Sequence, residues 1–119
     1  MDTRSKIIAD AGAARGAAAV CGYFDVLRPW HVAELARAKA AHGALAAIVL
    51  PLANELLSQV ARAEMAASLR VIDYVIAAGP GELEAILARL EPAEIVRLEE
   101  ADLRRRGELI EHVHRRQIR

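Results

Sequence analysis

An arginine and a histidine stand three positions apart in the stretch CGYFDVLRPWH, residues 21–31. Arg28 carries a permanent charge on a planar fork that suits phosphate oxygens, and His31 is a titratable donor. Pro29 lies between them and is typical of the first turn of a helix. A helix that begins here directs unpaired N–H groups and the positive end of its dipole toward an anion. These residue types and their spacing predict an anion site, with phosphate as the candidate ligand.

The elements that must position this site alternate between apolar runs and helical patterns. We predict strands in residues 17–21, 44–50, 71–77 and 93–98, where short apolar runs are bounded by glycine or proline. Helices are expected in residues 1–15, 29–42, 53–70, 82–90 and 101–117. The helix over 53–70 should be amphipathic, with Leu56, Leu57, Val60 and Met65 toward one side.

Strands separated by helices of this length favour right-handed crossovers and a parallel sheet that is covered on both faces. The 119 residues and 12.9 kDa are enough for one hydrophobic core and too few for two. We therefore expect a single α/β domain over residues 1–119, with an N-terminal helix in 1–15 and a core in 16–119. It should have three layers and a parallel sheet of about four to five strands. In such a sheet, ligands bind at the carboxyl ends of strands, where residues 22–31 begin.

Composition limits the possible partners. Sixteen basic residues balance sixteen acidic ones, so no net field attracts nucleic acid or an anionic membrane. No apolar run approaches the roughly 20 residues of a membrane span, and the first residues lack a signal-peptide core. The single cysteine, Cys21, excludes an internal disulfide and a cysteine metal cage. His112 and His114 are poorly spaced on a helix for a metal. We expect a cytoplasmic protein without a metal site built from protein ligands alone.

The stretches 21–31 and 62–76 each contain a pattern that resembles a motif of the cytidylyltransferase-like nucleotidyltransferases, closest to heptose-phosphate adenylyltransferase and glycerol-3-phosphate cytidylyltransferase. Residues matching the G-x-F-D-x-x-H-x-G-H signature are Gly22, Phe24, Asp25 and His31, with Leu27 and Pro29 between them. The stretch RAEMAASLRVIDYVI, residues 62–76, is similar to the family's R-x-x-x-L-x-x-L-x-x-V-D-x-V segment. The resemblance covers about residues 15–115. It implies the Rossmann-like fold of these nucleotidyltransferases.

The resemblance also implies a reaction. In this family a phosphate of the acceptor attacks the α-phosphorus of CTP or ATP and expels pyrophosphate, usually with Mg²⁺. The implied acceptor is a sugar or polyol phosphate, and a homo-oligomer is common. His31 and Arg28 would be the catalytic residues on the triphosphate. The implied nucleotide-binding residues are Gly22, Tyr23, Phe24, Asp25, Trp30 and Arg62.

The chain departs from the family at the reacting centre. It reads R-P-W-H where the family has H-x-G-H, so Arg28 keeps a charge with a different reach and Trp30 replaces the glycine that permits close approach. The family's lysine after the second strand and its C-terminal serine- and threonine-rich motif have no counterpart. Loss of one transition-state donor typically costs about 10² to 10³ in rate. We therefore hypothesise weakened or lost nucleotidyl transfer. The alternative is an inactive nucleotide- or phosphate-binding module, or a structural assembly module.

Several of these residues keep a second interpretation. Asp25 suits a cap of the turn by accepting backbone N–H bonds. Trp30 suits packing as well as stacking on a nucleobase. His31 is a histidine near a helix start if the resemblance does not hold, and Arg62 is then a scaffold residue. Cys21 is expected to behave as a small buried hydrophobe.

Overall fold

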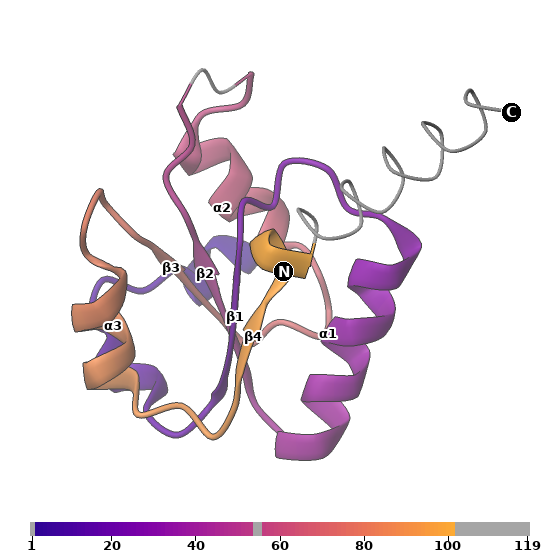
Figure 1. The fold of residues 1–119 in the computed structure, drawn as a ribbon, viewed down its shortest axis with the longest axis vertical. Coiled ribbons are helices and arrows are strands. Elements are labelled where there is room, and N and C mark those ends of the chain that lie inside the picture. Colours follow the sequence, from indigo (N-terminus) through magenta and orange to yellow (C-terminus); the bar gives the residue numbers. More distant parts are fainter. Residues whose placement is uncertain (1, 54–55, 102–119) are drawn as a thin grey trace, which may run out of the picture.

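The structure is a computed structural model that describes residues 2–53 and 56–101. Its strands are β1 (Ala18–Gly22), β2 (Leu45–Val49), β3 (Tyr74–Ala77) and β4 (Ile95–Arg97). They form a four-stranded parallel sheet in the order β3-β2-β1-β4, which can be followed from left to right in Figure 1. The predicted α/β fold with a parallel sheet is confirmed.

The two central strands are apolar because both of their faces are covered. Ala18 pairs with Leu45 and Gly22 with Val49, so β1 and β2 run in register along their whole length, and each of their residues is buried. Side chains alternate between two cores along β1: Val20 belongs to one core and Cys21 to the other. Such continuous apolar runs are typical of parallel strands that are buried on both faces.

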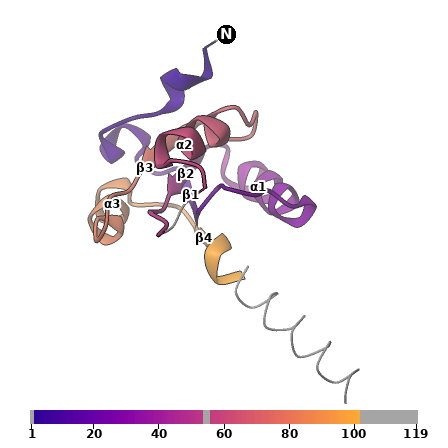
Figure 2. The same cartoon turned by 90° about the horizontal axis from the view of Figure 1, so that it is seen from above.

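Helices cover both faces of the sheet. On one face, α1 (Pro29–His42) and α2 (Gln59–Ala67) contribute Leu35 and Ala63, among others, to the core. On the other face, α3 (Leu83–Leu90) and the short 3₁₀ helix η2 (Ala11–Ala14) pack against the sheet. Figures 1 and 2 show α1 and α3 on opposite sides of the sheet. The three-layer arrangement is therefore as the alternating pattern predicts.

Helix α1 has the predicted bounds because both of its ends carry clear signals. Pro29 opens it, and Gly43 ends it with φ of 79°, a left-handed conformation that glycine adopts without a side-chain clash. At that end, one oxygen of Asp73 accepts hydrogen bonds from Lys39 Nζ at 2.6 Å and from the Leu45 N–H at 2.9 Å. The carboxylate thus ties the end of α1 to the starts of β2 and β3.

The expected helix over residues 1–15 is wrong. The structure has two short 3₁₀ helices there, η1 (Thr3–Lys6) and η2, each started by an aspartate side chain that accepts a backbone N–H. Between them the chain is extended: Ile7 forms a parallel bridge with Val75, and the Ile8 N–H donates to the Val75 carbonyl at 2.9 Å. Pairing with the edge of β3 satisfies this backbone better than a continuous helix of modest intrinsic stability would.

The helix predicted over residues 53–70 is also shorter, since α2 starts only after Ser58, whose hydroxyl caps it by accepting the Ala61 N–H at 3.1 Å. The apolar side chains expected along one side of this amphipathic helix are all exposed: Leu56, Leu57, Val60 and Met65. The buried face consists of Arg62, Ala63, Ala66 and Ala67. Small alanines let the helix lie close to the sheet, so the buried stripe is not the one with the largest side chains.

The last strand is shorter than predicted, and the helix after it begins earlier than predicted. Residues 93–98 were expected to form a strand, whereas β4 spans Ile95–Arg97 and residues 98–101 are helical. The remainder of the helix predicted over 101–117 lies outside the described residues.

Candidate functional site

The strand order places a switch point beside β1. From β1 the chain passes through α1 to β2 and then to β3, whereas β4 pairs with the opposite edge of β1. Connections from the carboxyl ends of β1 and β4 therefore leave in different directions. In open α/β sheets the ligand crevice lies outside the carboxyl ends of strands at such a point. The residues of the predicted anion site follow β1 directly, so the topology puts them at this edge.

The loop between β1 and α1 begins with a tightly packed turn. Phe24 is buried and has φ of 55°, a left-handed conformation that is uncommon outside glycine and that functional loops often contain. A Cβ atom on Gly22 would lie 3.4 Å from Leu98 Cβ and 3.4 Å from the Phe24 ring. The exposed Asp25 accepts the N–H of Val26 at 2.9 Å. This bond agrees with the interpretation of Asp25 as a turn residue, and its role toward a ligand stays a prediction.

His31 takes part in the start of α1. Its Nδ1 accepts the backbone N–H of Arg28 at 2.7 Å, as the glutamate of a capping box does. A nitrogen that accepts an N–H carries no proton itself, so the neutral ring holds its proton on Nε2. The residue is only 3% exposed. The fold therefore fixes both the orientation and the tautomer of His31, with the Nε2–H as its donor.

Trp30 lies against this histidine. The two ring centroids are 4.1 Å apart with an angle of 32° between the ring planes. The indole is partly buried and packs against the core that α1 and α2 share with the sheet. Trp30 is therefore a packing residue at the site, as one of its two interpretations predicts. Arg28, in contrast, is exposed at the same turn. The structure thus brings Arg28, Trp30 and His31 together.

Arg62 connects the segments that follow β1 and β2. Its side chain is fully buried, and Nη1 donates to the carbonyl of Tyr23 at 2.9 Å and to that of Leu50 at 2.7 Å. Its Nε donates to the Leu57 carbonyl at 3.3 Å. These carbonyls belong to the connections that follow β1 and β2. The scaffold interpretation of Arg62 thus has direct support, while contact with a nucleotide phosphate stays a prediction.

Glu99 is a buried carboxyl that sequence reasoning missed. It follows β4 on the same edge, and its Oε1 lies 3.6 Å from Arg97 Nη1. Burial raises the pKa of Glu99 above its ordinary value, and the charge of Arg97 acts in the opposite direction. The signal that could have found it is the pair Glu99 and Glu100 directly after a predicted strand, because ligands bind outside the carboxyl ends of parallel strands.

Cys21 is a buried, unreactive thiol. It is 0% exposed, which agrees with its expected behaviour as a small hydrophobe. Burial, together with the charge of Glu99, raises the pKa of the Cys21 thiol to about 11. We therefore expect iodoacetamide at pH 8 to label Cys21 at least roughly 100-fold more slowly in the native protein than in concentrated urea, because thiolate is the reactive form. Mass spectrometry over time measures both rates, and similar rates would contradict the burial.

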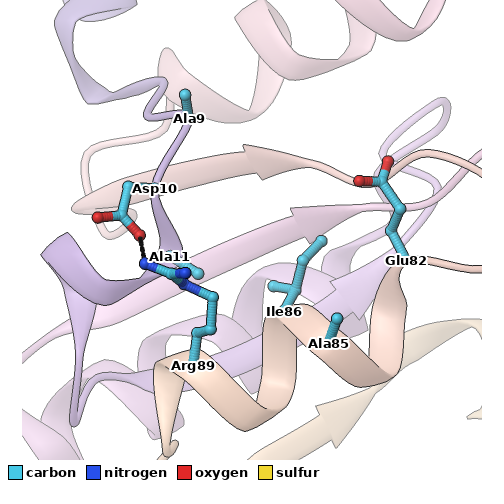
Figure 3. A pocket seen from close by; sticks show the side chains of 7 residues that line it. All are labelled: Ala9, Asp10, Ala11, Glu82, Ala85, Ile86 and Arg89. Atoms are coloured by element: carbon cyan, nitrogen blue, oxygen red, sulfur yellow. Dashed lines mark hydrogen bonds and ion pairs between the residues drawn. The ribbon is translucent and has the colours of Figure 1, made fainter.

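A shallow hollow of about 390 Å³ lies elsewhere, between α3 and the segment before η2. Figure 3 shows Arg89 reaching from α3 to Asp10, and their ion pair is 2.5 Å long. Glu82, at the other end, accepts the N–H of Gly79 at 2.7 Å. The hollow contains none of the predicted site residues. Within the part of the chain that the structure describes, no group of three histidine, cysteine or acidic side chains could hold a metal, and no helix could cross a membrane.

These observations define an α/β protein of the Rossmann-like kind, with a candidate anion site at the switch point beside β1. A crystal structure of the lipopolysaccharide core biosynthesis protein from Thermoplasma volcanium GSS1 is similar to this chain, with a TM-score of 0.61 and 20% sequence identity. The similarity covers 67% of this chain and 71% of that protein. At this identity it shows the fold. No family model and no curated protein sequence matches the chain.

Proposed function

We propose that the chain is a nucleotidyltransferase-like protein that binds a nucleotide by its phosphates at the β1–α1 turn. Its transfer of CMP or AMP to a sugar or polyol phosphate is weak or lost. The fold shared with a lipopolysaccharide core biosynthesis protein supports an acceptor that contains a sugar. The position of the turn at the switch point supports the phosphate contact.

The observation that carries this proposal is the fixed tautomer of His31. Because Nδ1 accepts the Arg28 N–H, the proton of the ring lies on Nε2 without the need for a charged imidazole. In the proposed role, this imidazole and the start of α1 face phosphate oxygens, on which negative charge develops as pyrophosphate leaves. The exposed guanidinium of Arg28 adds a permanent positive charge at the same turn.

Weak transfer follows from the neighbours of His31. The indole of Trp30 lies over the imidazole, at a position where the family's glycine leaves space for the nucleotide. The Nη1 and Nε groups of Arg62 already donate hydrogen bonds to three backbone carbonyls. This crowding favours the second candidate function, a module that binds a nucleotide or phosphate without catalysis.

Mg²⁺ would enter with the triphosphate. It usually keeps several waters and takes one or two carboxylates in addition to phosphate oxygens. Asp25 is the exposed carboxylate of the β1–α1 loop and fits this modest requirement. The ion would neutralise charge on the phosphates, while Arg28 and His31 hold their oxygens.

Titration calorimetry with CTP and ATP, each with Mg²⁺, tests the binding. We expect Arg28→Ala to weaken binding about tenfold, since hydrogen bonds to charged groups contribute roughly 1.5–3 kcal/mol. The control is Arg70→Ala, which removes an equal charge from an exposed residue between α2 and β3. Arg70 precedes the amino end of β3, whereas the site follows the carboxyl end of β1. Equal effects of the two substitutions would show a general charge effect and contradict the site.

Pyrophosphate release separates the two candidate functions. The assay combines CTP or ATP with glycerol 3-phosphate or a heptose phosphate. Slow release that His31→Ala abolishes supports the enzyme, and nucleotide binding without release supports the inactive module. If neither nucleotide binds to the wild-type protein, both are wrong.

A further inference from the structure

One oxygen of the Glu99 carboxyl is buried without a hydrogen bond to the described residues. Glu99 is 9% exposed, and its Oε2 makes no hydrogen bond with any residue that the structure describes. Oε1 faces the guanidinium of Arg97 at 3.6 Å. Native proteins rarely bury a carboxyl oxygen without a partner, because removing it from water costs free energy that nothing restores. A ligand that donates a hydrogen bond to Oε2 would remove this cost.

Glu99 follows β4, the strand next to β1, whose carboxyl end leads into the anion site. Arg97, two residues earlier, pairs with Cys21 of β1, and Leu98 packs beside Gly22 at the start of the β1–α1 loop. Glu99 therefore belongs to the β4 side of the switch point, and the start of α1 to the β1 side. A nucleotide whose phosphates lie at α1 can place its base over the carboxyl end of β4, the neighbouring strand.

We propose that Glu99 Oε2 accepts a hydrogen bond from the exocyclic amino group of the nucleotide's base. This inference rests on the proposed function and assigns the base-selecting residue of the same site. Cytosine and adenine carry an amino group where uracil and hypoxanthine carry an oxygen. An oxygen facing a carboxylate oxygen would leave both without a donor, so the site should select CTP over UTP and ATP over ITP.

The local charges agree with a ligand group that donates. Glu84 and Glu100 are exposed on the elements beside Glu99, and Arg97 is the described cation closest to it, with Nη2 4.0 Å from Glu84. Oε1 is turned toward that cation, which leaves Oε2 to accept. Two carboxyl groups, those of Glu84 and Glu99, lie near this one guanidinium, and the charge of Glu100 also acts on Glu99, which favours a donor such as an amino group over an additional anion.

Titration calorimetry with CTP, UTP, ATP and ITP, each with Mg²⁺, tests this assignment. We expect the wild-type protein to bind CTP or ATP about tenfold more tightly than the partner nucleotide that lacks the amino group. Glu99→Leu should reduce this ratio to about one while the protein still binds triphosphates. Glu99→Gln turns its amide oxygen toward Arg97 and places an NH₂ donor where Oε2 was, so it should lose or reverse the preference. The matched control Glu100→Leu removes an equal charge from the exposed neighbour and should leave the ratio unchanged.

Urea unfolding of the same variants checks that Glu99 is not needed for the fold. Because leucine removes a buried oxygen without a partner, Glu99→Leu should unfold at the same or a higher urea concentration than the wild type. A lower midpoint, or a wild-type protein that binds CTP and UTP equally and ATP and ITP equally, would overturn the assignment of Glu99 and leave the phosphate site intact. Loss of binding for all four nucleotides would instead contradict the proposed function itself.

Discussion

Replacing Arg62 with methionine is expected to lower the free energy of unfolding by about 3–5 kcal/mol, as measured by urea denaturation. Methionine is similar in length but donates no hydrogen bond. The change leaves the carbonyls of Tyr23, Leu50 and Leu57 without the guanidinium that they now share. Each buried acceptor that loses its partner costs roughly 1–3 kcal/mol, and the removal of a buried charge offsets part of this sum.

Arg70→Met is the matched control for this experiment. Arg70 is an exposed arginine in the turn after α2, and its replacement should change the free energy of unfolding by no more than about 0.5 kcal/mol. Arg62→Lys keeps the charge with fewer and less well-placed donors, so its loss should fall between the other two. If Arg62→Met and Arg70→Met were equally stable, the network of carbonyl contacts would contribute nothing to the fold.

The contacts of Arg62 also connect stability to the site. Tyr23 and Leu50 follow neighbouring strands, and one nitrogen of the guanidinium holds both of their carbonyls. This bridge fixes the start of the loop that carries Arg28 and His31. The proposed phosphate contacts therefore depend on a buried residue that holds the backbone carbonyls of both connections.

The sequence predicts the sheet because local signals agree there with the tertiary environment. Buried parallel strands need continuous apolar runs, and residues 17–21 and 44–50 have them between glycine or proline residues. Pro29 and Gly43 likewise mark both ends of α1 by their backbone preferences alone. These features require no knowledge of which elements come into contact. The alternation of strands and helices is then sufficient for the fold class.

The sequence could not predict which face of α2 is buried or what its arginine contacts. The largest apolar residues near this helix, Leu56 and Val60, are exposed, and the buried face consists of alanines and Arg62. Burial of an arginine depends on carbonyls that come from two other connections, so the helical pattern contains no sign of it. The unsatisfied oxygen of Glu99 is likewise a property of the packed edge of the sheet.

At the candidate site, sequence reasoning identified the residues but not their local bonds. The sequence pattern predicts Arg28 and His31 as residues of the anion site, and the structure places both at the start of α1. The hydrogen bond to Nδ1 of His31 depends on how the first turn folds, and so does the contact with the Trp30 ring. The structure therefore adds a tautomer and a steric obstacle to a motif that was visible in the sequence.

Restoring the family's pattern should raise the rate of nucleotidyl transfer. The double variant Arg28→His with Trp30→Gly recreates H-x-G-H, removes the indole from the His31 ring and opens the turn to a closer approach of the nucleotide. A well-placed transition-state donor typically contributes about 10² to 10³ in rate. We therefore expect pyrophosphate release from CTP or ATP, with a sugar or polyol phosphate as acceptor, to increase about 100-fold over the wild type.

Two further variants show which residue causes the increase in rate. Trp30→Phe keeps an aromatic ring over His31 and should leave the rate near that of the wild type. This result would show that the increase comes from removing the ring and not from any substitution at position 30. His31→Ala in the double variant should abolish the gain, because the Nε2–H donor is lost. Glycine near a helix start costs about 1 kcal/mol and the loss of the partly buried indole adds to this, so urea unfolding must show a folded double variant before the rates are compared. A folded double variant that binds CTP or ATP without faster release would refute the view that Trp30 and Arg28 limit the reaction, and would favour the inactive binding module.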